Sequence, residues 1–251
     1  MPTALMVGAH NEECEYNCGG LACKLARKGW RVVFLNIIGD YSNWPMWPDG
    51  MPDGQESINR DAMEAARRLG AEKILLDFKG HHFSACDPSS LARIAEVIDD
   101  LKPDLMATHW PQDTNYDHRE VARASFSAAQ TTALLPRRDG HVVPEIIAHE
   151  GYLYQSYHFT PDFCVRIDDC MDALSHSFQA FQTYPAIVEE FERIKPIQSR
   201  ARGAHIWPGG HAEAYSFLKF GPQLSVLPEL LGEDFRASGF ARGTGLFGSS
   251  A

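Results

Sequence analysis

No apolar run in this sequence of 251 residues reaches roughly 20 residues, the length that a helix needs to cross a bilayer. Basic residues are few, with 23 Lys and Arg against 33 Asp and Glu, and they form no cluster. The formal net charge of -10 therefore argues against a nucleic acid partner and against docking on an anionic membrane. The opening residues carry no basic region and turn polar early, unlike a signal peptide, and we expect a cytoplasmic protein.

Two kinds of motif are also missing. The six cysteines show no C-x2-C spacing, and in a cytosolic protein we interpret them as reduced structural thiols. The first apolar run ends in Gly-Ala-His-Asn-Glu-Glu rather than in a glycine-rich loop. Carboxylates at that place would repel a pyrophosphate, which argues against a Rossmann nucleotide-binding protein.

Short apolar runs alternate with segments of helical periodicity along the first half of the chain. We expect buried strands at 3–9, 31–38, 72–78 and 104–110, and helices at 14–28, 56–69, within 87–103 and at about 118–133. Gly70 suits the C-cap of the second helix, and Asp87 followed by Pro88 suits the start of the third.

The second half is expected to add strands within 145–157 and 163–168, and a helix within 169–183. The alternation predicts an α/β fold, Rossmann-like, with three α/β/α layers and a mainly parallel sheet. We expect a single domain over residues 1–251, with its Gly- and Ser-rich end at 229–251 partly loose.

Two polar clusters follow the expected first and fourth strands. The first reads His-Asn-Glu-Glu at 10–13, and the second reads Asp-Thr-Asn-Tyr-Asp-His at 113–118. In the usual doubly wound order these strands lie side by side at the switch point, so the clusters should meet beyond their carboxyl ends. Taken singly, each cluster also has an ordinary interpretation, as an acidic first helical turn or as an N-cap.

Together the clusters offer two imidazoles and a carboxylate. His10, Glu13 and His118 are a sufficient set for a catalytic zinc ion with an open coordination position. Glu12 is then left free beside the metal, where it could act on the bound water.

These residues resemble the LmbE/PIG-L-like zinc-dependent N-deacetylases. The family's Ala-His-Pro-Asp-Asp-Glu motif corresponds to Ala9–Cys14, and its Asp-x-His-x-Asp-His motif corresponds to Asp113–His118. Weaker likenesses are the pair Gly19-Gly20, the segment from Arg60 to Gly70, and the segment Gly210–Tyr215, which is similar to a Tyr-Ala-Glu-Ala-Phe motif.

The resemblance implies that His10, Glu13 and His118 bind Zn²⁺ or another divalent transition metal. It further implies roles for four more residues: Glu12 as general base, Asp117 as electrostatic support, Arg60 as a substrate contact, and His211 at a place where a tyrosine often helps bind the oxyanion.

The sequence also departs from the family pattern. Both motif aspartates are glutamates here, and Asn115 replaces a histidine assigned to oxyanion stabilisation or proton transfer. Asparagine can donate a hydrogen bond but cannot shuttle a proton. Either His81, His82 or His211 takes that second task, or Glu12 alone is the catalytic acid, or the protein is slow or inactive. Trp44, in a Trp- and Pro-rich loop near the expected mouth, either stacks on the substrate or pins the loop.

The implied reaction is hydrolysis of an N-acetyl or other N-acyl group on a small amine-containing molecule, most simply an amino sugar or its conjugate. Two alternatives stay open: a zinc amidase acting on a non-sugar amide, and a catalytically impaired homologue that only binds metal or ligand. The expected partner is a small N-acylated molecule, and a homo-oligomer is expected because members of the family often assemble.

Overall fold

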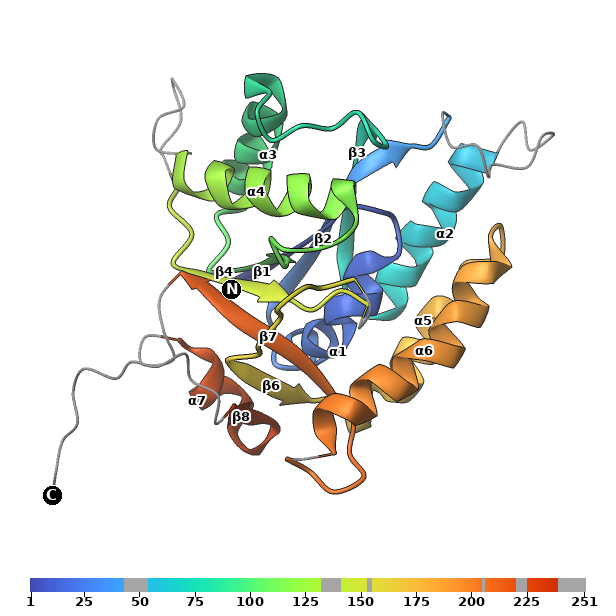
Figure 1. The fold of residues 1–251 in the computed structure, drawn as a ribbon, viewed down its shortest axis with the longest axis vertical. Helices are drawn as coiled ribbons and strands as arrows, with labels where there is room; N and C mark the ends of the chain where they lie inside the picture. Colours follow the sequence, from blue (N-terminus) through green and yellow to red (C-terminus); the bar gives the residue numbers. More distant parts are fainter. Residues whose placement is uncertain (43–53, 132–140, 153–154, 205, 220–224, 239–251) are drawn as a thin grey trace, which may run out of the picture.

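The computed structural model describes residues 1–42, 54–131, 141–152, 155–204, 206–219 and 225–238 (Figure 1). The first half contains β1 (Thr3–Gly8), α1 (Glu13–Arg27), β2 (Arg31–Asp40), α2 (Gly54–Arg68), β3 (Glu72–Lys79), α3 (Pro88–Leu101), β4 (Leu105–His109) and α4 (Tyr116–Thr131). The second half contains β5 (Glu145–His149), β6 (Phe163–Arg166), η2 (Asp168–Cys170), α5 (Met171–Phe178), α6 (Pro185–Gly203), β7 (Ala212–Lys219), α7 (Leu227–Leu231), η3 (Gly232–Asp234) and β8 (Phe235–Ala237).

The strands form one eight-stranded sheet in the order β3-β2-β1-β4-β5-β7-β6-β8. Strands β1 to β5 pair in parallel, whereas β7, β6 and β8 pair antiparallel to their neighbours. The fold is therefore mixed α/β with a mostly parallel sheet. The predicted pairing of the first and fourth strands is confirmed, with Ala4 opposite Leu105 and Met6 opposite Ala107.

Alternate residues of the parallel strands enter two separate apolar clusters. Ala4 and Met6 of β1 pack in a cluster with residues of α1, α2, α5 and α6. Leu5 and Val7 pack in the other cluster, with residues of α3 and α4. Since successive strand residues point to opposite faces, helices cover both faces of the sheet, as Figure 1 shows.

Local signals in the first half predicted its elements well. The side chain of Asp87 accepts a hydrogen bond from the backbone N–H of Ser89 and caps α3, and Pro88 lies in the first turn. Gly70, just after α2, has the positive φ of 75° that a C-cap glycine adopts. In the part of the chain that the structure describes, no helix is both long and apolar enough to cross a membrane.

The second half departs from expectation in several places, among them the unexpected strand β7. Strand β5 takes up only the first part of the expected segment 145–157, from Glu145 to His149. Helix α6 escapes prediction because it contains Pro196, a residue that normally interrupts a helix. Within the segment expected to be partly loose, residues 235–237 form β8, which pairs with β6, and the ring of Phe235 stacks on that of Phe163 with centroids 5.0 Å apart.

Candidate metal centre

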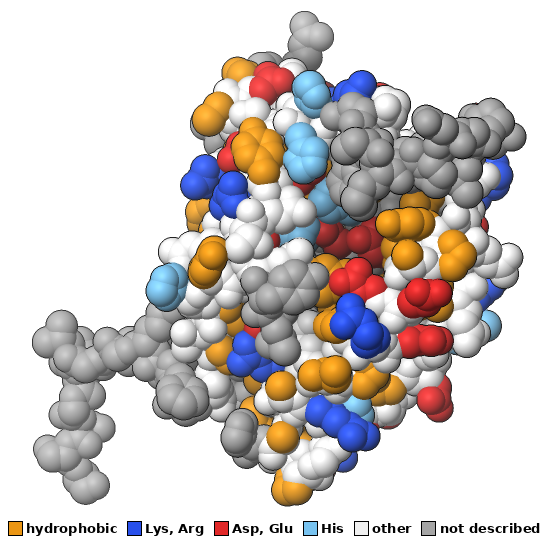
Figure 2. All heavy atoms as spheres, turned by 45° about the vertical axis from the view of Figure 1, so that its right-hand side comes forward, with side chains coloured by type: hydrophobic (Ala, Val, Ile, Leu, Met, Phe, Trp, Pro, Cys, Tyr) orange, Lys and Arg blue, Asp and Glu red, His pale blue; other side chains and the backbone are white. Residues whose placement is uncertain are grey.

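Two loops meet at the carboxyl edge of the parallel strands. One connects β1 to α1 and carries His10, and the other connects β4 to α4, whose first turn carries His118. They meet because β1 and β4 are adjacent and parallel. On the face drawn in Figure 2, histidine and acidic side chains gather at a hollow.

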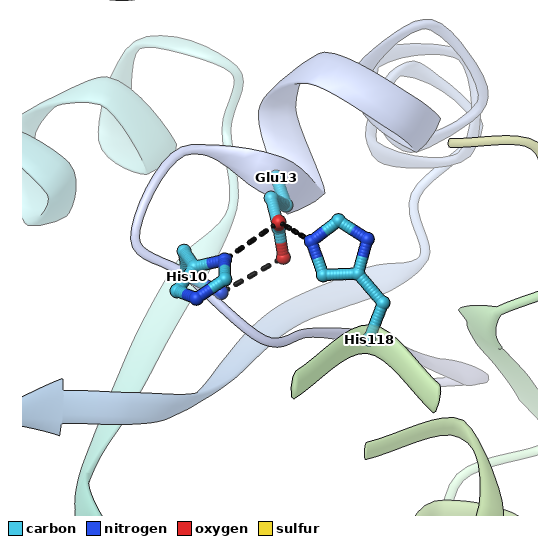
Figure 3. Close-up of side chains that lie close together, drawn as sticks. All are labelled: His10, Glu13 and His118. Carbon is cyan, nitrogen blue, oxygen red and sulfur yellow. Dashed lines mark hydrogen bonds and ion pairs between the residues drawn. The ribbon is translucent and has the colours of Figure 1, made fainter. Parts of the chain in front are cut away.

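His10, Glu13 and His118 form what we call the His-Glu-His site, and Figure 3 shows the three side chains pointing toward one another. All three are buried, and one ligand atom from each lies within 4.8 Å of the others. Oε1 of Glu13 is 2.9 Å from Nδ1 of His10 and 2.5 Å from Nε2 of His118. Two imidazoles and one carboxylate oxygen therefore converge on one point, a donor set that suits zinc and related divalent ions.

The other ring nitrogen of each histidine faces a carboxylate. Nε2 of His10 lies 3.2 Å from Oδ2 of Asp117, and Nδ1 of His118 lies 3.3 Å from Oδ1 of Asp113. Histidines that bind metals almost always have such a partner, because it fixes the ring orientation and makes the nitrogen facing the metal more basic. The surroundings of the two rings thus fit a metal as well as the ligand atoms do.

Glu13 is also held by its second oxygen. Oε2 accepts hydrogen bonds from the backbone N–H groups of Ala9, at 2.7 Å, and His10, at 2.8 Å. Nε2 of His109, the last residue of β4, lies 2.9 Å from the same oxygen. His109 was not predicted as a site residue, although a histidine at the carboxyl end of a strand beside the switch point is a signal that indicates such a role.

The loop that carries His10 is fixed through its backbone. The backbone N–H of Asn11 donates to Oη of Tyr41, at 3.0 Å, and the backbone carbonyl of Asn11 accepts from Nζ of Lys73, at 2.6 Å. Asn36 donates its side-chain amide to the carbonyl of His10. Because Asn36 lies in β2 and Lys73 in β3, hydrogen bonds from two strands of the sheet hold the backbone of this loop in place.

The ionisable groups of the site shift one another's pKa values. Burial lowers the pKa of His118, but the carboxylates of Glu13 and Asp113 together outweigh burial and raise that pKa to about 9. Burial likewise lowers the pKa of His10, and Glu13 with Asp117 raises it well above its usual value. Burial and the neighbouring Glu13 raise the pKa of Glu12 to about 7. Ionised Glu13 thus favours positive charge on the two imidazoles, as a site for a divalent cation requires.

Glu12 and Asn115 lie at the starts of the two helices that border the site. Glu12 immediately precedes α1 but makes no side-chain capping bond there. Asn115 does cap α4, because its Oδ1 accepts the backbone N–H of Asp117 at 2.9 Å. His81 lies beside Asp117, donating its backbone N–H at 2.9 Å from a left-handed conformation with φ of 59°.

Three other residues were expected at the site, and the structure describes two of them. His211 has its Nδ1 2.7 Å from Oγ of Ser199 on α6, and its backbone N–H donates to Asp168. Arg60 is exposed on α2, where its guanidinium donates to Ser57 one turn earlier. These contacts do not involve the His-Glu-His site. Trp44 lies outside the described residues.

Glu213 connects two of the weaker sequence likenesses, the Gly19-Gly20 pair in α1 and the segment Gly210–Tyr215. Helix α1 is interrupted at Cys18, and Glu213 of β7 accepts the backbone N–H groups of Gly20 and Leu21, each at 2.9 Å. Nζ of Lys195 lies 2.9 Å from the same carboxylate. A Cβ at Gly20 would come within 2.4 Å of the side chain of Ile167, which accounts for glycine at that position.

Residues 5–129 match the family PIG-L, described as GlcNAc-PI de-N-acetylase. The matched stretch contains both loops of the His-Glu-His site. The chain belongs to the PIG-L family. Among curated proteins, none matches this PIG-L family member.

Several solved structures have a similar fold. A 4-carboxy-2-hydroxymuconate hydratase from Pseudomonas putida has a TM-score of 0.74 at 20% identity, covering 88% of this chain and 98% of that chain. An N,N'-diacetylchitobiose deacetylase from Pyrococcus horikoshii also has a TM-score of 0.74, at 15% identity, covering 86% of this chain and 83% of that chain. The zinc-inhibited form of a teicoplanin deacetylase has a TM-score of 0.57 at 15% identity, covering 87% of this chain and 100% of that chain. At these identities the likeness establishes the fold of this PIG-L family member.

Proposed function

We propose that this protein is a metal-dependent hydrolase that removes an N-acetyl or other N-acyl group from a small amine-containing molecule, an amino sugar or its conjugate in the first instance. The observation that carries the proposal is the convergence of His10, Glu13 and His118 in a chain of the PIG-L family. The deacetylases among the structural neighbours support the reaction class, and the two layers of helices support describing the fold as Rossmann-like.

The His-Glu-His site would hold the metal, with Zn²⁺ as the first candidate. Three protein ligands leave a coordination position open, which is the arrangement of catalytic rather than structural zinc sites. When bound, a divalent ion supplies Lewis acidity to the acyl oxygen and to a water nucleophile. Both the donor set and the carboxylate behind each imidazole favour this assignment.

We assign Glu12 to move the proton. It precedes the ligand Glu13 in the chain, and its carboxylate makes no capping bond to the helix, which supports a role as acceptor of a proton from the attacking water. The same carboxylate then returns the proton to the leaving amine, so that acetate and a free amine are formed.

Asn115 is the donor that we assign to the acyl oxygen. Its Oδ1 is engaged with the N–H of Asp117, which fixes the amide and leaves its NH₂ group to donate. We assign no step to His211 or Arg60, since their hydrogen bonds go to Ser199 and Ser57 rather than to the metal ligands.

Hydration of an unsaturated acid is a second candidate, since a hydratase shares this fold at a TM-score of 0.74. It needs the same activated water but produces a hydroxy acid and releases no amine. Product analysis therefore separates the two reactions.

The test is a measurement of acetate and free amine released by the zinc-loaded protein from a panel of N-acetylated amino sugars and N-acetylated non-sugar amines. We expect turnover on at least one amino sugar, and Glu12→Gln should lower its rate roughly 10²–10⁴-fold while zinc stays bound. Glu56→Gln, at an exposed position on α2, is the matched control and should keep the wild-type rate. Full activity of zinc-loaded Glu12→Gln would overturn the mechanism, and zinc binding without turnover on the whole panel would favour a binding protein.

A further inference from the structure

His109 is fully buried at the end of β4 and packs directly behind the His-Glu-His site. Its ring stacks on that of His118, with centroids 4.3 Å apart and planes inclined by 16°. The other side of the ring meets His149 of β5 edge-on, at 4.6 Å. His109 thus lies between a proposed metal ligand and the interior of the sheet, and it cannot reach solvent.

The hydrogen bonds of the ring fix its tautomer. Nδ1 of His109 is buried without a partner, whereas Nε2 lies 2.9 Å from both Oε2 of Glu13 and the backbone nitrogen of Ala9. The N–H of Ala9 already donates to Oε2 of Glu13, at the shorter distance of 2.7 Å. An orphaned buried N–H is rarer than an orphaned acceptor, so the proton belongs on Nε2 and is directed at Glu13.

Oε2 of Glu13 then receives three N–H donors, from Ala9, His10 and His109. They occupy this oxygen and leave Oε1 facing the two ligand histidines. We propose that His109 is a positioning residue of the metal centre, which holds Glu13 so that it binds the ion through Oε1 alone. This inference rests on the proposed metal site.

The role of His109 follows from the length of the Glu13 side chain. A glutamate has one more rotatable bond than the aspartate of the resembled motif, and so it has more conformations to lose when it binds a metal. A donor fixed at the end of a buried strand selects one of these conformations in advance. Binding through one oxygen also keeps the site three-coordinate with respect to the protein, which leaves room for substrate and water.

The experiment compares zinc affinities, measured by competition with a chromogenic chelator, of wild type, His109→Leu, His109→Gln and His149→Leu. His109→Leu removes the donor and should weaken zinc binding about 10–100-fold. His109→Gln places an amide N–H close to the position of Nε2 and should restore affinity to within a few-fold of wild type. His149→Leu is the matched control, since His149 belongs to the same buried stack but its Nε2 lies near the carbonyl of Val7, at 3.3 Å; it should leave the affinity unchanged.

Cobalt substitution supplies a second readout. The visible absorption of the Co²⁺ protein should change in His109→Leu, because Glu13 loses its fixed binding mode, and should be unchanged in His149→Leu. If His109→Leu does not fold, His109→Asn replaces it, since the shorter amide cannot reach Oε2 and the same weakening is expected. Wild-type affinity in His109→Leu or in His109→Asn, or equal losses in the Leu and Gln variants, would overturn the positioning role. Absence of zinc binding by the wild type would instead overturn the proposed function.

Discussion

Nε2 of His10 lies 3.2 Å from Oδ2 of Asp117, although the two residues are 107 positions apart in the sequence. Asp117 is completely buried, and its carboxylate also accepts the backbone N–H of His81. It therefore joins the first loop of the site, the start of α4 and the turn after β3.

Asp117→Asn should weaken zinc binding about 10–100-fold, because a neutral amide supports the imidazole of His10 less well than a carboxylate does. The affinity is measured by chelator competition, with Asp172→Asn on the exposed side of α5 as the control. Equal zinc affinities of Asp117→Asn and wild type would show that Asp117 does not support the ligand.

Lys73 and Glu15 form an ion pair at 2.7 Å in which both side chains are fully buried. Burial raises the pKa of Glu15, and Lys73 partly offsets this effect. Lys73→Met would leave the carboxylate unpaired and also remove the donor to the carbonyl of Asn11. We expect the free energy of unfolding to fall by about 3–5 kcal/mol.

Urea unfolding of the metal-free protein measures this loss. The double variant Lys73→Met with Glu15→Gln should recover part of it, because no buried charge is then left alone. A loss of less than about 1 kcal/mol in Lys73→Met, the range of a surface pair, would contradict the assignment.

Glu213 supports the broken helix α1, and its removal should destabilise the protein. Glu213→Ala leaves the N–H groups of Gly20 and Leu21 without this acceptor and the ammonium of Lys195 without its carboxylate, all in the interior. Loss of one partner of a buried pair typically costs about 3–5 kcal/mol. Glu213→Gln keeps one acceptor oxygen, so its urea midpoint should fall between those of wild type and Glu213→Ala. Identical midpoints for the three proteins would contradict the capping role.

His149 should make the stability depend on pH below neutrality. Burial, followed by the neighbouring His109, lowers its pKa well below the usual 6.5, while Glu13 of α1 and His118 of α4 act on it more weakly. The unfolded chain therefore binds a proton at His149 below pH 6.5 that the folded chain does not bind, and the contribution of His149 to stability decreases as the pH falls. Between pH 7.5 and 5.5, metal-free His149→Gln should lose less unfolding free energy than wild type. Equal losses over this interval would show that His149 does not titrate in this way.

The sequence predicted the elements that position the site, because local patterns determine them. The run 3–9 ends in a polar turn, Asp87 precedes Pro88, and Gly70 follows a helix, and each of these signals depends only on neighbours in the chain. Adjacency of β1 and β4 followed from the order expected for an alternating α/β chain. This adjacency predicts that His10, Glu13 and His118 lie close together.

The supporting contacts could not be predicted, because they depend on register and side-chain direction. Whether His109 points toward Glu13 depends on the face of β4 on which it lies, and a shift of one residue would turn it to the other face. The same holds for Lys73 on β3 and Glu213 on β7, whose partners lie in α1. The roles expected for Arg60 and His211 came from resemblance alone, and their hydrogen bonds to Ser57 and Ser199 do not test these roles.

The most direct test of the central claim is a crystal grown with Zn²⁺, with anomalous difference density measured on both sides of the zinc absorption edge. The account predicts a zinc peak about 2.0–2.2 Å from one nitrogen of His10, one nitrogen of His118 and a single oxygen of Glu13. A zinc peak bound elsewhere, or no zinc peak between these three side chains, would contradict it.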